Sequence, residues 1–334
     1  MQVEILLRMP LKTLAKAICV SKKWASTIRS KHFKDLYLLQ SAKRPRALFV
    51  YFAIGSDALL RSVYQEEKPL FSSGQQQMLV SIDREADYVF SHPVRGLVCL
   101  QWGAKTVICN PGARKILTLP EIQKRTVADW GTAAYLGYDE VTDVYKVLCM
   151  RVQEAKECQV FTVGSGGDES WRWIICKHPH TPLTNAICKG GVLYYGAWYR
   201  DEKHFIVSFN VTSEEFNVID LPEGIKTDAY SNMVNYNGEI ALVNETAGNW
   251  RTNRIEVHHW EEESAGDLTF CFRGTVGTGE LVFTPDYEPQ GPFFVLYYDT
   301  VTKKLTRVEI QGVAGTGDHM VRTFLDHVDS PLLM

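Results

Sequence analysis

The sequence has 334 residues, of which 45% are hydrophobic and 22% are charged, and its formal net charge is −3. This composition is ordinary for a globular protein with enough apolar residues for a buried core, so it excludes an extended disordered chain. No run of about 18 apolar residues is present and the first residues do not resemble a secretory signal, so we expect neither a membrane partner nor secretion.

Positive charge is concentrated at the start of the chain. Residues 1–46 contain eleven Lys or Arg but only two acidic residues, a balance of +9, whereas the rest of the chain has a balance of −12. A basic helical segment commonly meets either nucleic acid or an acidic protein surface. Here the basic residues alternate with a dense apolar set instead of lying on one polar face, which favours a protein partner over nucleic acid.

The first 42 residues have the pattern of short helices. In "EILLRMP" a helix should stop before Pro10, because proline pushes the preceding residue out of the helical region. Ser21 could cap a later helix. After the proline, apolar residues recur at helical intervals: Leu11, Leu14, Ala17, Ile18, Trp24 and Ile28. So small a unit needs cover from a partner or from its own following domain, and the pattern alone leaves both open.

The segment "EILLRMPLKTLAKAICVSKKWASTIRSKHF" resembles the F-box of plant F-box families. Through this motif, substrate receptors of SCF-type (Skp–cullin–F-box) ubiquitin ligases bind a Skp-family adaptor and, through it, cullin. The resemblance implies an F-box over residues 1–42. It also implies a set of side chains shared between the adaptor interface and the helical core: Ile5, Leu6, Pro10, Leu11, Leu14, Val20, Trp24 and Ile28.

The resemblance has one departure at its N-terminal edge. Family members usually carry a Leu-Pro pair and an acidic residue several positions before the place of Glu4, and the sequence from Met1 does not contain them. We therefore expect an F-box that is incomplete at its N-terminus.

From Arg46 onward the chain changes to short runs of Val, Ile, Leu, Tyr and Phe separated by turn residues, which predicts an all-β domain. A glycine opens an apolar strand at Gly96, Gly191, Gly238 and Gly279. The spacings of 95, 47 and 41 indicate a repeat of about 47 residues, with the missing member near Asp143.

A second repeated element is a four-residue turn that begins with Asn or Asp. It occurs at Asn110, Asp139, Asn210 and Asp299, and each has Ala, Thr or Ser three residues later and an apolar residue six later. Such side chains hydrogen-bond the turn backbone, so we expect hairpin turns of one kind at these four positions.

A unit of 40–50 residues and about four strands is the size of a propeller blade, so residues 46–330 would form about six blades. The chain is then α+β overall, with a short helical unit followed by a propeller-like domain. We expect "VRTFLDHV", residues 321–328, to close the ring. A pair of β-sandwiches is the alternative fold.

Several segments of the β domain, among them "VICNPGARKILTLP" and "IVSFNVTSEEFNVIDLP", resemble the F-box-associated domain (type 3) of plant F-box proteins. The resemblance implies a substrate-recruiting module over residues 46–330. The expected function is therefore the substrate-recognition subunit of an SCF-type ubiquitin ligase, with an unknown protein target. The alternative is a stand-alone interaction module that no longer assembles into a ligase because its F-box is incomplete.

No motif predicts catalysis, a metal or a cofactor. His178 and His180 in "KHPHTP" lack a third ligand nearby, and we expect them on a solvent-exposed turn. The eight cysteines include no Cys-x-x-Cys pair and are expected to be reduced, buried thiols, in the nucleus, the cytoplasm or both. A propeller with a site in its central channel is a further possibility, which polar or titratable groups lining one end of that channel would favour.

Aromatic residues in loops are the candidates for target binding, because they make good interaction anchors. The loops "AWYRDEKHF" and "ETAGNWRTNR" combine aromatic and charged residues, and within them we single out Trp198, Tyr199, Trp250 and Arg251. Packing between blades is the alternative role for these aromatics.

Overall fold

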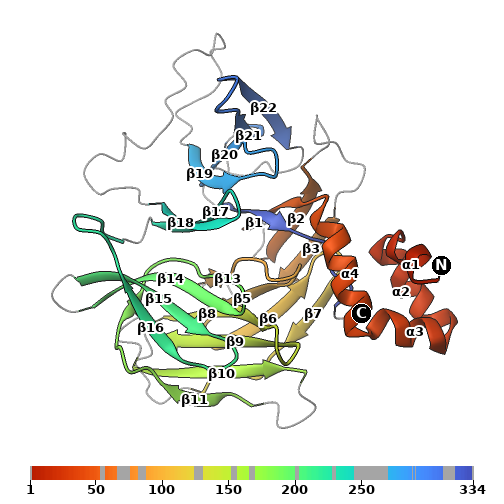
Figure 1. Cartoon of the computed structure of the whole chain (residues 1–334), viewed down its shortest axis with the longest axis horizontal. Coiled ribbons are helices and arrows are strands. Elements are labelled where there is room, and N and C mark those ends of the chain that lie inside the picture. The colour runs from red at the N-terminus through yellow and green to blue at the C-terminus, as the bar shows by residue number, and fades with distance from the viewer. Residues whose placement is uncertain are drawn as a thin grey trace.

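The structure is a computed structural model. It describes residues 2–52, 57–65, 76–81, 88–123, 131–151, 156–164, 170–199, 203–227, 231–243, 270–287, 289, 291–310 and 320–332. In this part of the chain, four N-terminal helices precede 23 strands, and the helices lie to one side of the β domain (Figure 1).

The helices are α1 (Gln2–Leu7), α2 (Leu11–Val20), α3 (Lys22–Arg29) and α4 (Lys31–Ala42). The break at Pro10 is confirmed, and Pro10 precedes the first residue of α2. Ser21 precedes α3 but its side chain makes no capping hydrogen bond, whereas the Ser30 hydroxyl accepts one from the Phe33 N–H at the start of α4 (3.3 Å). The apolar sides of the four helices enclose a small core of their own.

The strands form six antiparallel sheets. Sheet 1 contains β23 (Arg322–His327), β1 (Arg46–Phe52), β2 (Asp57–Tyr64) and β3 (Gln76–Ser81). Sheet 2 contains β4 (Tyr88–Phe90), β5 (Val98–Trp102), β6 (Lys105–Asn110) and β7 (Lys115–Thr118). Sheet 3 contains β8 (Thr132–Asp139), β9 (Val144–Arg151), β10 (Glu157–Val163) and β11 (Arg172–Ile175).

Sheet 4 contains β12 (Thr181–Pro182), β13 (Ile187–Lys189), β14 (Val192–Tyr199), β15 (Lys203–Asn210) and β16 (Phe216–Asp220). Sheet 5 contains β17 (Asn232–Tyr236) and β18 (Glu239–Val243). Sheet 6 contains β19 (Phe270–Thr275), β20 (Leu281–Pro285), β21 (Phe293–Tyr298) and β22 (Leu305–Ile310). Five sheets are thus complete four- or five-stranded blades, and in the described residues the sixth is represented by two strands.

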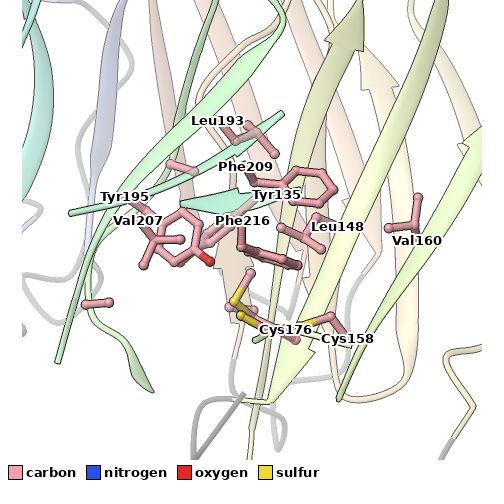
Figure 2. Packing of buried hydrophobic residues seen from close by; sticks show 14 of the residues in the cluster. Tyr135, Leu148, Cys158, Val160, Cys176, Leu193, Tyr195, Val207, Phe209 and Phe216 are labelled. Atoms are coloured by element: carbon pink, nitrogen blue, oxygen red, sulfur yellow. The ribbon is translucent and has the colours of Figure 1, made fainter. Parts of the chain in front are cut away.

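The sheets pack on one another in chain order and return to the first. Separate apolar clusters join sheet 1 to sheet 2, sheet 2 to sheet 3, sheet 3 to sheet 4 and sheet 6 to sheet 1. Strand β17 lies against both β14 and β19, which joins sheets 4, 5 and 6. Figure 2 shows the cluster between sheets 3 and 4, where Tyr135, Tyr195 and Phe209 fill the space between the two blades. The propeller-like fold is confirmed, and the sandwich alternative is wrong because the sheets succeed one another around a ring.

The ring is closed by the strand expected from the sequence. Strand β23 pairs with β1, with Leu48 opposite Phe324 and Phe49 opposite Thr323. Beside this pairing, Arg46 is only 1% exposed. Its Nε donates to the Ser62 hydroxyl (2.5 Å), and its Nη1 lies 3.7 Å from the Asp329 carboxylate. A buried guanidinium therefore stabilises the junction of the first and last strands of sheet 1.

All four predicted Asn or Asp turns are present. The side-chain oxygen accepts from backbone N–H groups two or three residues later, as Asp299 does from Val301 (2.8 Å) and Asn110 does from Ala113 (2.9 Å). The residue four positions after each has positive φ, between 54° and 61°: Arg114, Asp143, Glu214 and Lys303. The capping side chain thus holds a non-glycine residue in a left-handed conformation, which the composition of the turns did not reveal.

The glycine repeat is confirmed as a turn that leads into the second strand of a blade, or into the third strand in sheet 4. Gly96, Gly191, Gly238 and Gly279 have φ between 73° and 83°, and Asp143 (φ 59°) stands at the missing fifth place.

These turns lie at one end of the strands. We call this end the α4 face and define it by residues 91–97, 140–143, 190–191, 237–238 and 276–279.

We expect Asp139→Ala to lower the free energy of unfolding by about 1 to 3 kcal/mol. The Asp139 carboxylate is buried, and it accepts from Val141, Thr142 and, across to the next blade, the Thr212 hydroxyl (2.7 Å). Burial raises the pKa of this carboxyl, but those hydrogen bonds outweigh it and bring the pKa to about 2. Denaturant unfolding of the variant measures the loss. Asp139→Asn is the matched control, because Asn begins two of the four turns, and an equal loss in both variants would contradict the argument.

We also expect stability to fall as the pH falls from 6.5 toward 4 because of His327. Its ring is fully buried, and neither ring nitrogen has a hydrogen-bond partner among the described residues. Burial lowers its pKa from 6.5 to about 4. The unfolded state therefore binds more protons in this interval, and the loss reaches roughly 3 kcal/mol at the low end. Urea unfolding at pH 7 and pH 4.5 should show a smaller difference for His327→Gln; an unchanged difference would exclude His327 as the cause.

Candidate functional site

The residues predicted to bind the adaptor differ in how far they are buried. Four of them are at most 3% exposed and form the helical core: Leu6, Leu11, Leu14 and Ile28. Ile5 is 54% exposed and Val20 is 74% exposed, while Pro10 is also at the surface. Trp24 is partly buried against the core. The sequence identified the apolar residues of this unit, and packing decides which of them a partner can reach.

The exposed apolar residues are surrounded by positive charge. The exposed basic side chains in the segment of the first three helices are Arg8, which follows α1, and Lys12, Lys16, Lys22, Lys23 and Arg29 on α2 and α3. None of them forms an ion pair with another residue in the described part of the chain. An apolar surface with such a rim is suited to an acidic protein partner, because complementary charge speeds association and fixes orientation.

Helix α4 is attached to the β domain by charged and aromatic side chains. Arg95, in the turn between β4 and β5, forms an ion pair with Asp35 and lies 4.2 Å from the centre of the Tyr138 ring. The Lys31 ammonium donates to the Tyr138 hydroxyl (3.2 Å) and lies 3.5 Å from the Asp143 carboxylate. These contacts fix the N-terminal end of α4 against two turns of the α4 face.

The other end of α4 is held by the segment that follows β23. The Asp329 N–H donates to the Ser41 hydroxyl (2.7 Å), and the Tyr64 hydroxyl donates to the Asp329 carboxylate (3.3 Å). The Asn110 amide donates to the carbonyls of Ser330 (2.8 Å) and Leu332 (2.7 Å). The helical unit is therefore joined to the propeller by side-chain contacts as well as by the chain itself.

Two of the four residues predicted to bind a target lie in the described part. Trp198 and Tyr199 end β14, which begins at Val192 beside the α4 face. At about 3.3 Å per residue they lie roughly 20 Å from that face, at the opposite end of the blade. Trp198 is 38% exposed, so a partner can reach it. Trp250 and Arg251 lie outside the described residues.

The histidine pair is not a metal site. His178 is exposed as predicted, but the prediction is wrong for His180, which is fully buried. The Nδ1 of His180 lies 2.6 Å from the His178 carbonyl, and its Nε2 lies 2.8 Å from the Tyr195 hydroxyl. Both nitrogens are thus engaged within the protein, and sequence reasoning missed this because Tyr195 lies on another strand. Among the residues that the structure describes, no three His, Cys, Asp or Glu side chains could hold a metal ion.

No helix in the described residues is long and apolar enough to cross a membrane.

The chain matches two known domain families. Residues 1–36 match the F-box domain, and residues 47–328 match the F-box associated beta propeller domain. The Arabidopsis thaliana F-box protein At1g70960 is 46% identical, over 100% of this chain and 97% of that protein. The F-box protein DOR of Arabidopsis thaliana is 32% identical, over 99% of this chain and 92% of that protein.

Among solved structures, a TolB protein of Agrobacterium tumefaciens aligns with 84% of this chain and 98% of that chain. The sequence identity is 12% and the TM-score is 0.39, so this likeness supports no conclusion about fold or function. The family matches and the curated relatives agree over nearly the whole length of the chain. The chain belongs to the F-box proteins that carry an F-box associated beta propeller domain.

Proposed function

We propose that this protein is the substrate-recognition subunit of an SCF-type ubiquitin ligase. Its F-box would bind a Skp-family adaptor and, through it, cullin, while the propeller would hold a protein target. The observation that carries the proposal is a helical unit with exposed apolar side chains that is fixed to a propeller through α4. The protein would need no catalytic group of its own, because holding a target near a conjugating enzyme raises the local concentration of the reacting groups.

The adaptor would bind the side of the helices that carries Ile5, Pro10 and Val20. Apolar anchors of this kind, spaced along short helices, are typical of helix-in-groove recognition. The basic residues around them would steer an acidic adaptor onto this surface and set its orientation.

The target would bind the end of the propeller opposite the α4 face. The helical unit already covers part of the α4 face, and Trp198 and Tyr199 mark the opposite end. An attachment of defined geometry at one end would then hold the target at a fixed distance from the adaptor. We place this activity in the nucleus or the cytoplasm, which the eight free cysteines support because such compartments keep thiols reduced.

Replacement of Val20 by Asp should weaken adaptor binding by about tenfold or more. It should leave the melting temperature unchanged, because the Val20 side chain is 74% exposed. Calorimetric titration of the full chain into a Skp-family adaptor measures the affinity. Ile175→Asp is the matched control, because Ile175 is equally exposed, at 74%, but lies on β11 of the propeller.

The buried position 14 serves as a second comparison. Leu14→Asp should lose binding by unfolding the helices, since Leu14 is fully buried in their core. If the unmodified chain does not bind the adaptor at all, the stand-alone interaction module becomes the better description. If Val20→Asp and Ile175→Asp bind equally well, the adaptor surface proposed here is wrong.

Replacement of Arg95 by Ala should loosen α4 from the propeller without unfolding either. The variant loses both the ion pair to Asp35 and the contact with the Tyr138 ring. Trypsin should then cleave several-fold faster after Lys43, an exposed basic residue between α4 and β1. Lys115→Ala, at an exposed basic residue on β7, is the control for a lost positive charge. Equal cleavage rates in all three proteins would show that Arg95 does not hold the junction.

A further inference from the structure

A cavity of about 830 Å³ occupies the centre of the ring at the α4 face. Side chains and turns of sheets 1, 2, 4, 5 and 6 line it, and Ala42 and Pro45 lie at its edge, where the helical unit joins the propeller. Its volume falls within the range of pockets that bind small molecules, about 300 to 1,000 Å³. Polar and titratable groups line this end of the channel, which is the feature that favours a ligand site in the centre of a propeller.

Most of the charged groups in this cavity already have partners. The Lys189 ammonium lies 2.6 Å from the Glu239 carboxylate at the rim. Arg273 forms an ion pair with Asp286, which also keeps the pKa of Asp286 low against the effect of burial. The positive charge of Arg322 acts on the same Asp286 and on His92, and it contributes to the low pKa of His92. Lys189 and Arg273 are therefore paired with carboxylates other than Asp326, and the charge of Arg322 influences Asp286 and His92.

Asp326 is the exception. It is the last residue but one of β23, and its exposed side chain lines the cavity. The Asn235 amide donates to its carboxylate (3.0 Å). No Lys, Arg or His side chain forms an ion pair with it in the described part of the chain. The surrounding protein desolvates the carboxyl and raises its pKa, and no positive charge offsets this effect. The carboxylate can accept further hydrogen bonds and lacks the cation that would compensate its desolvation.

The neighbouring amide is held in the orientation that this carboxylate requires. The Asn235 Oδ1 accepts from the Gly238 N–H (2.8 Å), so its amide nitrogen is the group that faces Asp326. Gly238 also supplies a carbonyl to the Lys189 ammonium (2.8 Å). The carboxylate thus sits in a preorganised polar wall, and preorganisation lowers the cost of binding.

We propose that this cavity binds an organic cation, a protonated amine or a guanidinium group, whose N–H groups donate to the Asp326 carboxylate. The cation could be carried by a small molecule or by a Lys or Arg side chain of a protein ligand, and the two share the same chemistry. This inference goes beyond the proposed function and does not depend on adaptor binding. It adds a ligand site at the junction between the F-box and the propeller, on the opposite end from Trp198.

The test is calorimetric titration of the full chain, without adaptor, with two cationic probes. Cadaverine represents a small diamine, and the peptide acetyl-Ala-Lys-Ala-amide represents a protein side chain. The same peptide with norleucine in place of lysine is the uncharged match. We expect at least one cationic probe to bind and the norleucine peptide not to bind. Which of the two cationic probes binds more tightly distinguishes the two sources of the cation.

Asp326→Asn should weaken binding of the cationic probe by about tenfold or more, because it removes a charge-assisted hydrogen bond. The control is Asp220→Asn, at an exposed carboxylate of β16 that pairs with Lys203 outside the cavity, and it should bind as the unmodified chain does. Equal affinity in the two variants would overturn the proposal, as would binding of neither cationic probe.

A second measurement does not depend on the folding of a variant. In the unmodified chain, addition of the cationic probe should shift the NMR signal of the Asn235 side-chain amide, because that amide shares the Asp326 carboxylate with the ligand. Binding without a shift of this signal would place the probe elsewhere and overturn the proposal. Since the adaptor takes no part in either experiment, a failure here is separate from a failure of the F-box to bind its adaptor.

Discussion

The pairing of β23 with β1 is the contact on which the rest of the structure depends. It joins a strand near the end of the chain to the strand that directly follows the F-box helices. Without it, sheet 1 would lose its innermost strand and sheets 6 and 1 would lose part of the apolar cluster between them. Arg46 stabilises the same place, since its guanidinium is buried between Ser62 and Asp329. The position of the F-box relative to the propeller follows from this closure, because Asp329 also contacts Ser41 of α4.

Local chemistry explains why much of the fold could be predicted. The Asn and Asp turns depend on a side chain and a backbone only three residues apart, so four occurrences in the sequence correspond to four turns in the structure. The glycine repeat is similar, because a positive φ is required at one place in each hairpin. Its apparent gap at Asp143 is explained by the capping of that turn by Asp139, which makes glycine unnecessary there.

The contacts that could not be predicted join residues far apart in the chain. Asp35 and Arg95 are separated by 60 positions and Lys31 and Tyr138 by 107, and no spacing rule connects them. The same limit applies to His180, whose environment depends on Tyr195. Within the F-box, apolar spacing identified Leu14 and Val20 alike. Leu14 is fully buried in the core of the four helices, whereas Val20, the last residue of α2, lies outside that core and is 74% exposed. The carboxylate of Asp326 had no signal in the sequence, since only the ring brings it opposite Asn235.

Closure of the ring by β23 also sets the order in which parts of this protein can fold during synthesis. Strand β23 follows every other described strand in the chain, so sheet 1 can be completed only when synthesis has passed His327. A contact between residues 46 and 327 has a large sequence separation, and such contacts form late in folding because a long loop must close first. The F-box helices can fold early from local contacts, but Asp329 can fix α4 in place only afterwards. A chain broken off before β23 would therefore lack the Asp329 contact at Ser41, and its α4 would be attached to the propeller only near Lys31 and Asp35.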